Sequence, residues 1–453
     1  MEYKDKCALV VGMARSGVGA AQLLCAHGAH VIVNDSKTRE ELKCDLSALD
    51  SLPVTWQLGR PAVELLEGVD VLVLSPGIPD TVPFVRRAKE MGIYVIGEVE
   101  LASQLAPGEL AAITGTNGKT TTTTLVAEMV RCGGRRAWAV GNIGDSYAAA
   151  GLESHPEDVM VCEISSFQME TADTFHPHVA ALLNITEDHL NRHGTMEVYT
   201  QMKMRVFARQ TGEDVAVFND DDPALIPLMG QVRSQVMRFS RQHEVAQGAF
   251  VRDGMVVLRW AGEEKAICSV ADIFIPGPHN LENALAAVCI ACALGVPVEA
   301  IAETLRTFRG VEHRIEFTRE LDGVTYYNDS KGTNVDSTIR AVQTMTRPTA
   351  IILGGSDKHC DFTPLVKAMQ ASGMIREAVL IGVTADQIES TLRANGYEAI
   401  HRASTMEEAV ACCRELAGPG WNVLLSPACA SFDMFQDYEQ RGRIFKEIVN
   451  GLA

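Results

Sequence analysis

The stretch AAITGTNGKTTTTTLVAEMV, residues 111–130, decides how the whole chain is interpreted. An apolar run typical of a buried strand enters a turn and then a helical pattern. Gly115 and Gly118 allow backbone conformations in which successive N–H groups converge on phosphate oxygens at a helix N-terminus. Lys119 would then reach the β- and γ-phosphates, and the Thr120 hydroxyl would bind Mg²⁺. The stretch therefore predicts a nucleotide phosphate loop.

This loop departs from the generic Walker pattern in one position. The pattern wants a glycine six positions before the lysine, but Ile113 stands there, so the loop is a compressed variant. The alternative is a glycine turn capped by threonines, with Lys119 merely solvated. The order of strand, turn, lysine, hydroxyl and helix favours the phosphate loop, whose expected ATP-binding residues are Gly115, Thr116, Asn117, Gly118, Lys119, Thr120 and Thr121.

Length, net charge and cysteine content limit the classes of protein to which the chain can belong. A chain of 453 residues is long enough for two to four domains. Its net charge of −18 is a poor footprint for nucleic acid or anionic membrane, so neither is expected as a partner. Twelve scattered cysteines show no disulfide pattern, and Cys289 with Cys292 lies in an apolar helical run where packing is favoured over zinc. No apolar segment resembles a signal peptide or a membrane span, so we expect a cytoplasmic protein.

The N-terminus predicts a dinucleotide-fold opening. Residues 7–12 are typical of a buried strand, 16–27 of a helix, and 30–35 of a second strand that ends in an acid. Gly12, Ala14 and Gly17 occupy the three glycine positions, so the middle glycine, where backbone approaches a pyrophosphate, is missing. A dehydrogenase is therefore disfavoured. Asp35 would hold a ribose hydroxyl or serve as an ordinary turn residue, and the residues alone leave both open.

Three ionisable residues downstream of the phosphate loop are out of place for their surroundings. Glu163 lies inside an apolar strand, where a carboxylate is costly unless it meets a metal or a base. His189 follows another buried strand, in a loop where acid and imidazole can meet a cation. Lys203 lies on the apolar side of a helix expected over residues 196–210, so its stem snorkels or its amine is held in the site. The residues alone favour snorkelling.

Asn280 and Asn283 stand about one turn apart at the head of a long helix, where amides cap the helix or contact a base edge.

The last third of the chain predicts a second nucleotide-fold domain. From about Val311, strands and helices alternate to the end, which indicates a Rossmann-like α/β domain. Lys331 and Lys358 lie at strand ends there, and each is a weak signal alone.

Seven segments taken together resemble one family. Their order and spacing are similar to those of the Mur ligases of bacterial cell-wall synthesis. The segments are GTNGKTT, EISSFQ, NITEDHLNRHG, GPHNLENALAA, GVEHR, YYNDSKGTN and SPACASFDMFQDYEQRG. The Rossmann-like N-terminus and the C-terminal signature resemble the branch that adds D-glutamate to UDP-N-acetylmuramoyl-L-alanine. The resemblance implies an α/β fold of three domains: a Rossmann-like UDP-binding domain over 1–97, a central P-loop ATPase domain over 98–310, and a Rossmann-like domain over 311–453 that binds the amino acid and closes over ATP.

The resemblance also implies roles for individual residues. The catalytic set would be Lys119, Glu163, His189 and Lys203, with two Mg²⁺ ions held by Thr120, Glu163, His189 and a carbamylated Lys203. The nucleotide would also meet Asn280, Asn283, Arg314, Asp329 and Lys331. The UDP substrate would be bound by Arg15, Ser16, Asp35, Ser36, Lys37, Gly77 and Asn142, and the amino acid by Lys331, Thr333, Lys358, Ser431 and Tyr438.

The implied activity is amide ligation by a monomer in peptidoglycan precursor synthesis, through an acyl phosphate made from ATP and the L-alanine carboxylate. Lys119 and two Mg²⁺ ions would neutralise the repulsion between carboxylate and triphosphate. The alternatives are a Mur ligase for another amino acid, a nicotinamide-dependent dehydrogenase, and a nucleotide-gated binding protein with slow hydrolysis. ATP consumption that depends on both an amino acid and a UDP-sugar distinguishes a ligase from the last two.

Overall fold

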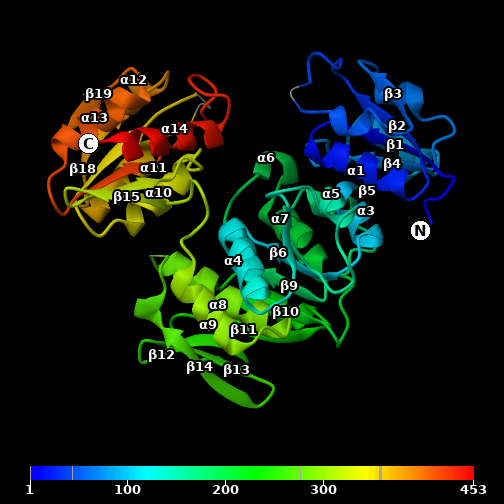
Figure 1. The fold of residues 1–453 in the computed structure, drawn as a ribbon, viewed down its shortest axis with the longest axis horizontal. Coiled ribbons are helices and arrows are strands. Elements are labelled where there is room, and N and C mark those ends of the chain that lie inside the picture. Colours follow the sequence, from blue (N-terminus) through cyan, green and yellow to red (C-terminus); the bar gives the residue numbers. More distant parts are fainter. Residues whose placement is uncertain (1, 43, 276, 357–359) are drawn as a thin grey trace. The chain divides into compact units, whose positions relative to one another are not determined.

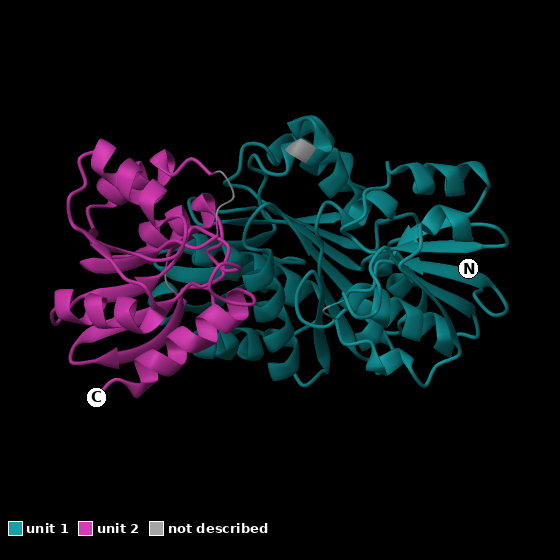
Figure 2. Cartoon of the chain, turned by 90° about the horizontal axis from the view of Figure 1, so that it is seen from above, with its two compact units in different colours: residues 1–273, 279–308 teal, residues 274–278, 309–453 magenta. Residues whose placement is uncertain are grey.

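The computed structural model describes residues 2–42, 44–275, 277–356 and 360–453. The chain forms two compact units (Figure 2). One comprises residues 1–273 and 279–308, and the other residues 274–278 and 309–453. Each unit is built of α/β layers, and the three sheets follow one another along the chain (Figure 1).

The N-terminal sheet has five parallel strands in the order β3-β2-β1-β4-β5. Residues 8–11 of β1 and the whole of β4 are buried, because helices cover both faces of a parallel sheet. The strand order reverses beside β1, and ligands of such sheets bind at the carboxyl ends near this point. The elements are β1 (Cys7–Val11), α1 (Arg15–Ala26), β2 (His30–Asp35), η1 (Ser47–Leu49), β3 (Val54–Leu58), η2 (Ala62–Leu65), β4 (Val71–Leu74), α2 (Pro83–Glu90), β5 (Tyr94–Gly97) and α3 (Glu98–Leu105).

The central sheet has nine strands in the order β14-β13-β12-β11-β10-β9-β6-β8-β7. The strands from β7 to β12 in this row are parallel, so their carboxyl ends share one edge; β13 and β14 add an antiparallel hairpin. The elements are β6 (Glu109–Thr114), α4 (Lys119–Cys132), β7 (Ala137–Gly141), α5 (Tyr147–Gly151), β8 (Val159–Glu163), η3 (Gln168–Thr171), β9 (Val179–Leu182), α6 (Leu190–His193), α7 (Met196–Met204), η4 (Arg205–Phe207), β10 (Val215–Asn219), η5 (Ile226–Gln231), β11 (Gln235–Ser240), β12 (Gly248–Arg252), β13 (Met255–Trp260), β14 (Glu263–Ser269), η6 (Val270–Asp272), α8 (Pro278–Ala293) and α9 (Val298–Thr307).

The C-terminal sheet has six strands in the order β15-β16-β20-β17-β18-β19, parallel except for the β15–β16 pair. Its strands β17 and β20 are buried along their whole length between helical layers. The elements are β15 (Glu316–Leu321), β16 (Val324–Asn328), α10 (Val335–Thr344), β17 (Thr349–Leu353), α11 (Thr363–Ser372), β18 (Ile375–Leu380), α12 (Ala385–Ala394), β19 (Ile400–Arg402), α13 (Met406–Leu416), β20 (Asn422–Leu425) and α14 (Tyr438–Gly451).

One predicted element is too long. The helix expected over residues 196–210 ends as α7 at Met204, and residues 205–207 continue as a 3₁₀ turn. The tighter turn carries Val206 and Phe207 into the core, where both are buried. Lys203 remains in the last turn of α7, on the side that faces the phosphate loop.

The helices of the described residues are short or carry charges. None of them combines the length and the apolar character that a bilayer-spanning helix requires.

Candidate active site

The phosphate loop lies at the carboxyl end of β6, where the expected strand, turn and helix follow one another. Gly118 has φ +83° and is the N-cap of α4, a conformation that favours glycine. Gly115 packs against the next loop, since a Cβ on it would lie 3.0 Å from the Cβ of Leu183. The Lys119 amine donates to the carbonyls of Gly115 and Thr116, each at 2.9 Å. The lysine thus curls over the loop on which phosphates are expected.

The segment after β9 holds this loop in shape. The Asn184 side chain accepts a hydrogen bond from Asn117 N at 2.8 Å and donates to Asn117 O at 3.1 Å. The Thr116 hydroxyl donates to Thr186 O at 3.1 Å and accepts from Thr186 N at 3.0 Å. Asn184 was not singled out from the sequence, although an amide directly after a buried strand is a detectable signal.

Lys203 is held in the interior and does not snorkel to solvent. It is 2% exposed, and its amine donates to Gly115 O at 2.8 Å. The amine also lies 4.7 Å from the centre of the Tyr199 ring, whose hydroxyl is 3.1 Å from the Thr116 hydroxyl. Burial, with a smaller contribution from the Lys119 ammonium, lowers the pKa of Lys203 to about 6. The interpretation favoured by the residues alone is therefore wrong.

Glu163 ends β8 as a buried carboxylate, 2% exposed. Its Oε1 accepts a hydrogen bond from the Asn142 amide at 2.9 Å, and its Oε2 has no hydrogen-bond partner among the described residues. An unpaired buried carboxylate oxygen is costly. Oxygen donors of this kind suit a hard divalent cation, so the residues present fit Mg²⁺.

His189 lies at the start of α6 with φ +53°, and about half of its side chain is exposed. Its Nε2 is 3.4 Å from Asp188 Oδ2, and its ring packs against Phe167 with the centroids 4.7 Å apart. Phe167 also carries the Arg192 guanidinium at 4.1 Å from its ring centre. These contacts hold the imidazole against Phe167, which lies in the segment that follows Glu163.

The head of α8 touches the phosphate loop directly. Asn283 Oδ1 lies 3.4 Å from the Thr122 hydroxyl, and a Cβ on Gly118 would come within 2.2 Å of that same oxygen. The Asn283 amide also donates to Asn280 Oδ1 at 3.3 Å, and both asparagines are buried. The structure therefore brings Asn280 and Asn283 together with the loop around Lys119.

The N-terminal sheet carries a cavity of about 990 Å³ at the carboxyl ends of its strands. Of the residues predicted to bind UDP, Asp35, Ser36 and Lys37 line this cavity, whereas Arg15, Ser16 and Gly77 are not among its lining residues. Asp35 accepts hydrogen bonds from Met13 N at 2.9 Å and Lys37 N at 3.0 Å, so it shapes both turns. The sequence did not single out several further lining residues: Arg60, Val63, Ile78, Phe84 and Arg87.

Arg15 points to the loop between β7 and α5. Its guanidinium donates to Gly144 O at 3.0 Å. The same loop carries Asn142, which binds Glu163. Beyond it, α5 packs on α1 so closely that a Cβ on Gly19 would lie 2.2 Å from Ser146 Oγ. Arg15 and Asn142 therefore belong to one loop cluster within this unit.

In the other unit, the loops after β16 and β20 gather most of the remaining predicted residues. Asp329 is buried and accepts from the Ser426 hydroxyl at 2.6 Å; burial raises its pKa to about 7. The Lys331 amine lies 5.3 Å from the centre of the Tyr438 ring. Ser431, after β20, is buried. Thr333, after β16, and Arg314, shortly before β15, are partly exposed. Lys358, predicted for the amino-acid site, lies outside the described residues.

Arg441 organises these two loops and was missed in the sequence. It is 1% exposed and donates to Ser330 Oγ and O at 2.9 and 2.7 Å, and to Cys429 O at 3.1 Å. Burial lowers its pKa to about 10. The signal was present in the YEQRG segment, but an arginine on a helix ordinarily indicates a solvated face.

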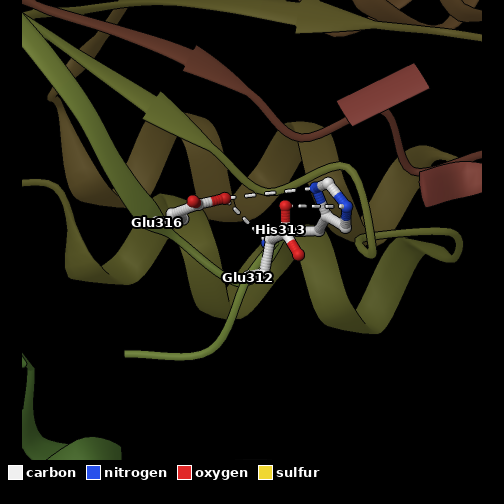
Figure 3. A group of neighbouring side chains, drawn as sticks. All are labelled: Glu312, His313 and Glu316. Atoms are coloured by element: carbon white, nitrogen blue, oxygen red, sulfur yellow. Dashed lines mark hydrogen bonds and ion pairs between the residues drawn. The ribbon is translucent and has the colours of Figure 1, made fainter. Parts of the chain in front are cut away.

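Glu312, His313 and Glu316 are the one group of acidic and histidine side chains in the described parts of the chain with metal-like spacing (Figure 3). The Lys446 amine already donates to both carboxylates, at 2.6 and 2.9 Å. The group is therefore an ion-pair network, and we assign it no metal.

Three family descriptions match the chain in sequence order. They are the Mur ligase MurD-like N-terminal domain over residues 6–97, the Mur ligase middle domain over 113–291, and the Mur ligase glutamate ligase domain over 313–429. The chain belongs to the Mur ligase family, an α/β fold of three domains.

Individual relatives are similar over the full length. A UDP-N-acetylmuramoylalanine--D-glutamate ligase of Caldanaerobacter subterraneus is 46% identical, with all of both chains covered. One from Alkaliphilus oremlandii is 45% identical at the same coverage. Among solved structures, a UDP-N-acetylmuramate-alanine ligase of Thermotoga maritima has a TM-score of 0.60 at 18% identity, over 98% of this chain and 99% of that one. The structural likeness concerns the fold alone.

Proposed function

We propose that the chain is the ATP-dependent ligase that joins D-glutamate to UDP-N-acetylmuramoyl-L-alanine in peptidoglycan precursor synthesis. The observation that carries this proposal is full-length identity of 45–46% to ligases named for this reaction. Two features support it chemically. The Lys119 and Lys203 amines both lie at the phosphate loop, and the buried Glu163 ends β8, the strand next to the one that leads into this loop.

In this proposal Lys119 binds the ATP phosphates from its position over the loop carbonyls. Its charge offsets the repulsion between the triphosphate and the incoming carboxylate of L-alanine. That carboxylate attacks the γ-phosphorus and ADP leaves, which yields an acyl phosphate. The amine of D-glutamate then displaces phosphate and forms the amide, with loss of a proton from nitrogen.

Thr120, Glu163, His189 and Lys203 would hold two Mg²⁺ ions, which would supply charge neutralisation at the phosphate oxygens. Lys203 would contribute as a carbamate, because a largely neutral buried amine can react with CO₂ and become an anion. Its lowered pKa of about 6 supports this role. The open Oε2 of Glu163 supports the assignment of the other ligand.

The remaining residues divide between the substrates. Residues 1–97 would bind the UDP moiety through a set of polar residues and one glycine: Arg15, Ser16, Asp35, Ser36, Lys37 and Gly77. Asn142, in the central domain, would contact the UDP-muramoyl substrate. Residues 98–310 would bind ATP, with Arg314, Asp329 and Lys331 contributing from 311–453. In that last domain, Lys331, Thr333, Lys358, Ser431 and Tyr438 would bind D-glutamate. We propose a cytoplasmic monomer.

The product tests this proposal against the other members of the family. The protein is incubated with ATP, Mg²⁺, UDP-N-acetylmuramoyl-L-alanine and one amino acid at a time. The mass of the UDP-linked product is then measured by mass spectrometry. We expect a D-glutamyl adduct and no adduct with L-glutamate, L-alanine or meso-diaminopimelate. An adduct with another amino acid, in place of D-glutamate, would assign the chain to a different reaction.

A further inference from the structure

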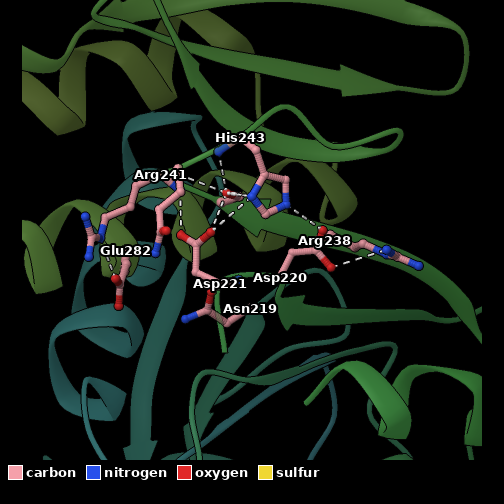
Figure 4. A network of polar contacts seen from close by, with 9 residues as sticks. Asn219, Asp220, Asp221, Arg238, Arg241, His243 and Glu282 are labelled. Carbon is pink, nitrogen blue, oxygen red and sulfur yellow. Dashed lines mark hydrogen bonds and ion pairs between the residues drawn. The ribbon is translucent and has the colours of Figure 1, made fainter. Parts of the chain in front are cut away.

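The edge of the central sheet next to the phosphate loop carries a polar network whose members the proposed function does not use (Figure 4). It is formed by the ends of β10 and β11, which are parallel neighbours. The labelled members are Asn219, Asp220, Asp221, Arg238, Arg241, His243 and Glu282. Glu282 comes from α8, where it lies between Asn280 and Asn283 in sequence.

The network first fixes the turn after β11. Asp221 accepts hydrogen bonds from the Ser240 hydroxyl at 2.6 Å and from Arg241 N at 2.8 Å. Ser240 Oγ in turn accepts from the backbone N–H of His243 at 2.9 Å. Asp221 is itself held, because its N–H donates to Asn219 Oδ1 at 2.9 Å. The backbone of Arg241 is therefore anchored independently of its side chain.

The same edge is tied to the phosphate loop. Asp222, which follows Asp221, accepts from Ile185 N at 3.1 Å. The next residue, Thr186, exchanges two hydrogen bonds with Thr116 of the phosphate loop. The turn that carries Arg241 is thus connected to that loop through consecutive strand ends.

The Arg241 side chain leaves this anchored turn and reaches α8. Its Nε donates to Glu282 Oε1 at 2.7 Å, and the two side chains are 36% and 26% exposed. The neighbouring contact between Thr122 and Asn283 is longer, at 3.4 Å. A charge-assisted hydrogen bond at 2.7 Å is the stronger constraint on the head of the helix.

We propose that the Arg241–Glu282 ion pair positions the head of α8 against the phosphate loop, so that Asn280 and Asn283 are ready to bind the nucleotide. This inference rests on the proposed ATP-dependent function. Arg241 and Glu282 act through α8 and are positioning residues. Without the pair, ATP has to order the helix head on binding, and its affinity falls while the chemical step is retained.

A small set of full-chain variants tests the inference. Arg241→Gln and Glu282→Gln each remove the pair from one side, and the double variant removes both partners. Arg238→Gln is the matched control, because Arg238 lies on β11, shortly before Arg241, and its side chain pairs with Asp220 at 3.2 Å and not with Glu282. The exchange Arg241→Glu with Glu282→Arg restores the pair in reverse.

Calorimetric titration with ATP and Mg²⁺ gives Kd, and steady-state assays give KM for ATP and kcat. We expect each single variant to raise Kd and KM roughly five-fold, since partly exposed pairs are modest in strength, with kcat within about two-fold. The double variant should be no worse than either single variant. The control should match the parent protein, and the exchange should recover most of the affinity.

An unchanged Kd for ATP in both single variants would overturn the inference, and so would affinity losses that add up in the double variant. In either case, ATP binding by the parent protein would still support the proposed function. A loss of kcat without a change in KM would also overturn it. If the parent protein itself binds no ATP, the proposed function fails first, and the positioning role falls with it.

Discussion

At the scale of single residues, Lys203 is the most informative side chain. The sequence places it on the apolar side of a helix, which is compatible with a snorkelling stem or a buried amine. The structure decides between the two, because the amine donates to Gly115 O and the side chain is buried. The periodicity of the sequence cannot make this distinction. It shows on which face of the helix a side chain lies, but not whether another segment covers that face and buries the side chain.

Lys203→Ala should lose ligase activity and regain part of it when formate or acetate is added. The small acid would enter the vacated space and replace the anion that a carbamylated Lys203 would supply. Lys203→Arg is the control, because its permanent positive charge fills the space and should not respond to added acid. Full activity of the alanine variant without acid would contradict a role for this amine. Steady-state rates at increasing formate concentration measure the effect.

Glu98 should make the stability of this unit depend on pH. The carboxylate is buried, accepts from Ala148 N at 2.6 Å, and burial raises its pKa to about 7 from 4.5. In the pH range between these values the folded state binds more protons than the unfolded state, so stability falls as pH rises and the loss levels off above about pH 7. The contribution lost between about pH 5 and about pH 8 is about 2–3 kcal/mol.

Glu98→Gln removes this titration and keeps a polar side chain at the same place. Urea unfolding of both proteins at about pH 5 and about pH 8 measures the difference. We expect the parent protein to lose stability relative to the variant as pH rises. Parallel pH profiles would show that Glu98 titrates normally in the folded protein.

At the scale of elements, the junction of β6 and α4 depends on Gly118. Its φ of +83° and the 2.2 Å distance from an added Cβ to Asn283 Oδ1 are two separate costs of introducing a methyl group. Gly118→Ala should therefore weaken ATP binding as well as stability. Gly134→Ala is the matched control, because its φ is +90° with nothing within 4 Å of the added Cβ.

In both alanine variants the free energy of unfolding should fall by about 1–2 kcal/mol, because alanine is strained in the left-handed conformation. Only Gly118→Ala should also raise the Kd for ATP, because Asn283 has to move. Thermal unfolding gives the first quantity and calorimetry the second. Equal ATP affinity in the two variants would show that the contact with Asn283 is unimportant for the nucleotide.

The sequence predicts some elements well and others poorly. The strand at residues 30–35 and the run from β6 into α4 have strong apolar patterns and fixed turn residues, and they form as expected. By contrast, β3 is nowhere fully buried, so it lacks the apolar run that identifies a parallel strand. The predicted end of α7 is wrong because a 3₁₀ turn continues the same apolar spacing.

At the scale of the whole molecule, the order of motifs predicts the family better than any single site. Segments that carry chemistry follow strand ends in all three sheets, as open α/β folds require. Contacts made by backbone and by distant side chains could not be predicted, such as Asn184 with Asn117 or Arg441 with Ser330. These depend on which loops meet at a sheet edge, and a single sequence does not encode strand order in a local pattern.

The net charge of −18 also acquires a meaning at this scale. An acidic molecule that binds nucleotides has to concentrate its positive charge locally. Lys119 and Lys203 both donate to Gly115 O, which places two amines at one carbonyl of the phosphate loop. The nearby Lys119 charge adds to burial in lowering the pKa of Lys203. In the proposed function, the arrangement that binds phosphate would therefore also favour carbamylation of the second amine.

The acyl phosphate is the central claim, and the path of an oxygen atom tests it most directly. UDP-N-acetylmuramoyl-L-alanine labelled with ¹⁸O in the alanine carboxylate is turned over with ATP and D-glutamate, and the released phosphate is analysed by mass spectrometry. Attack by the carboxylate predicts one ¹⁸O atom in each phosphate formed, with release dependent on both substrates. Phosphate that carries no label, or that appears at the same rate without D-glutamate or the UDP substrate, would contradict the account.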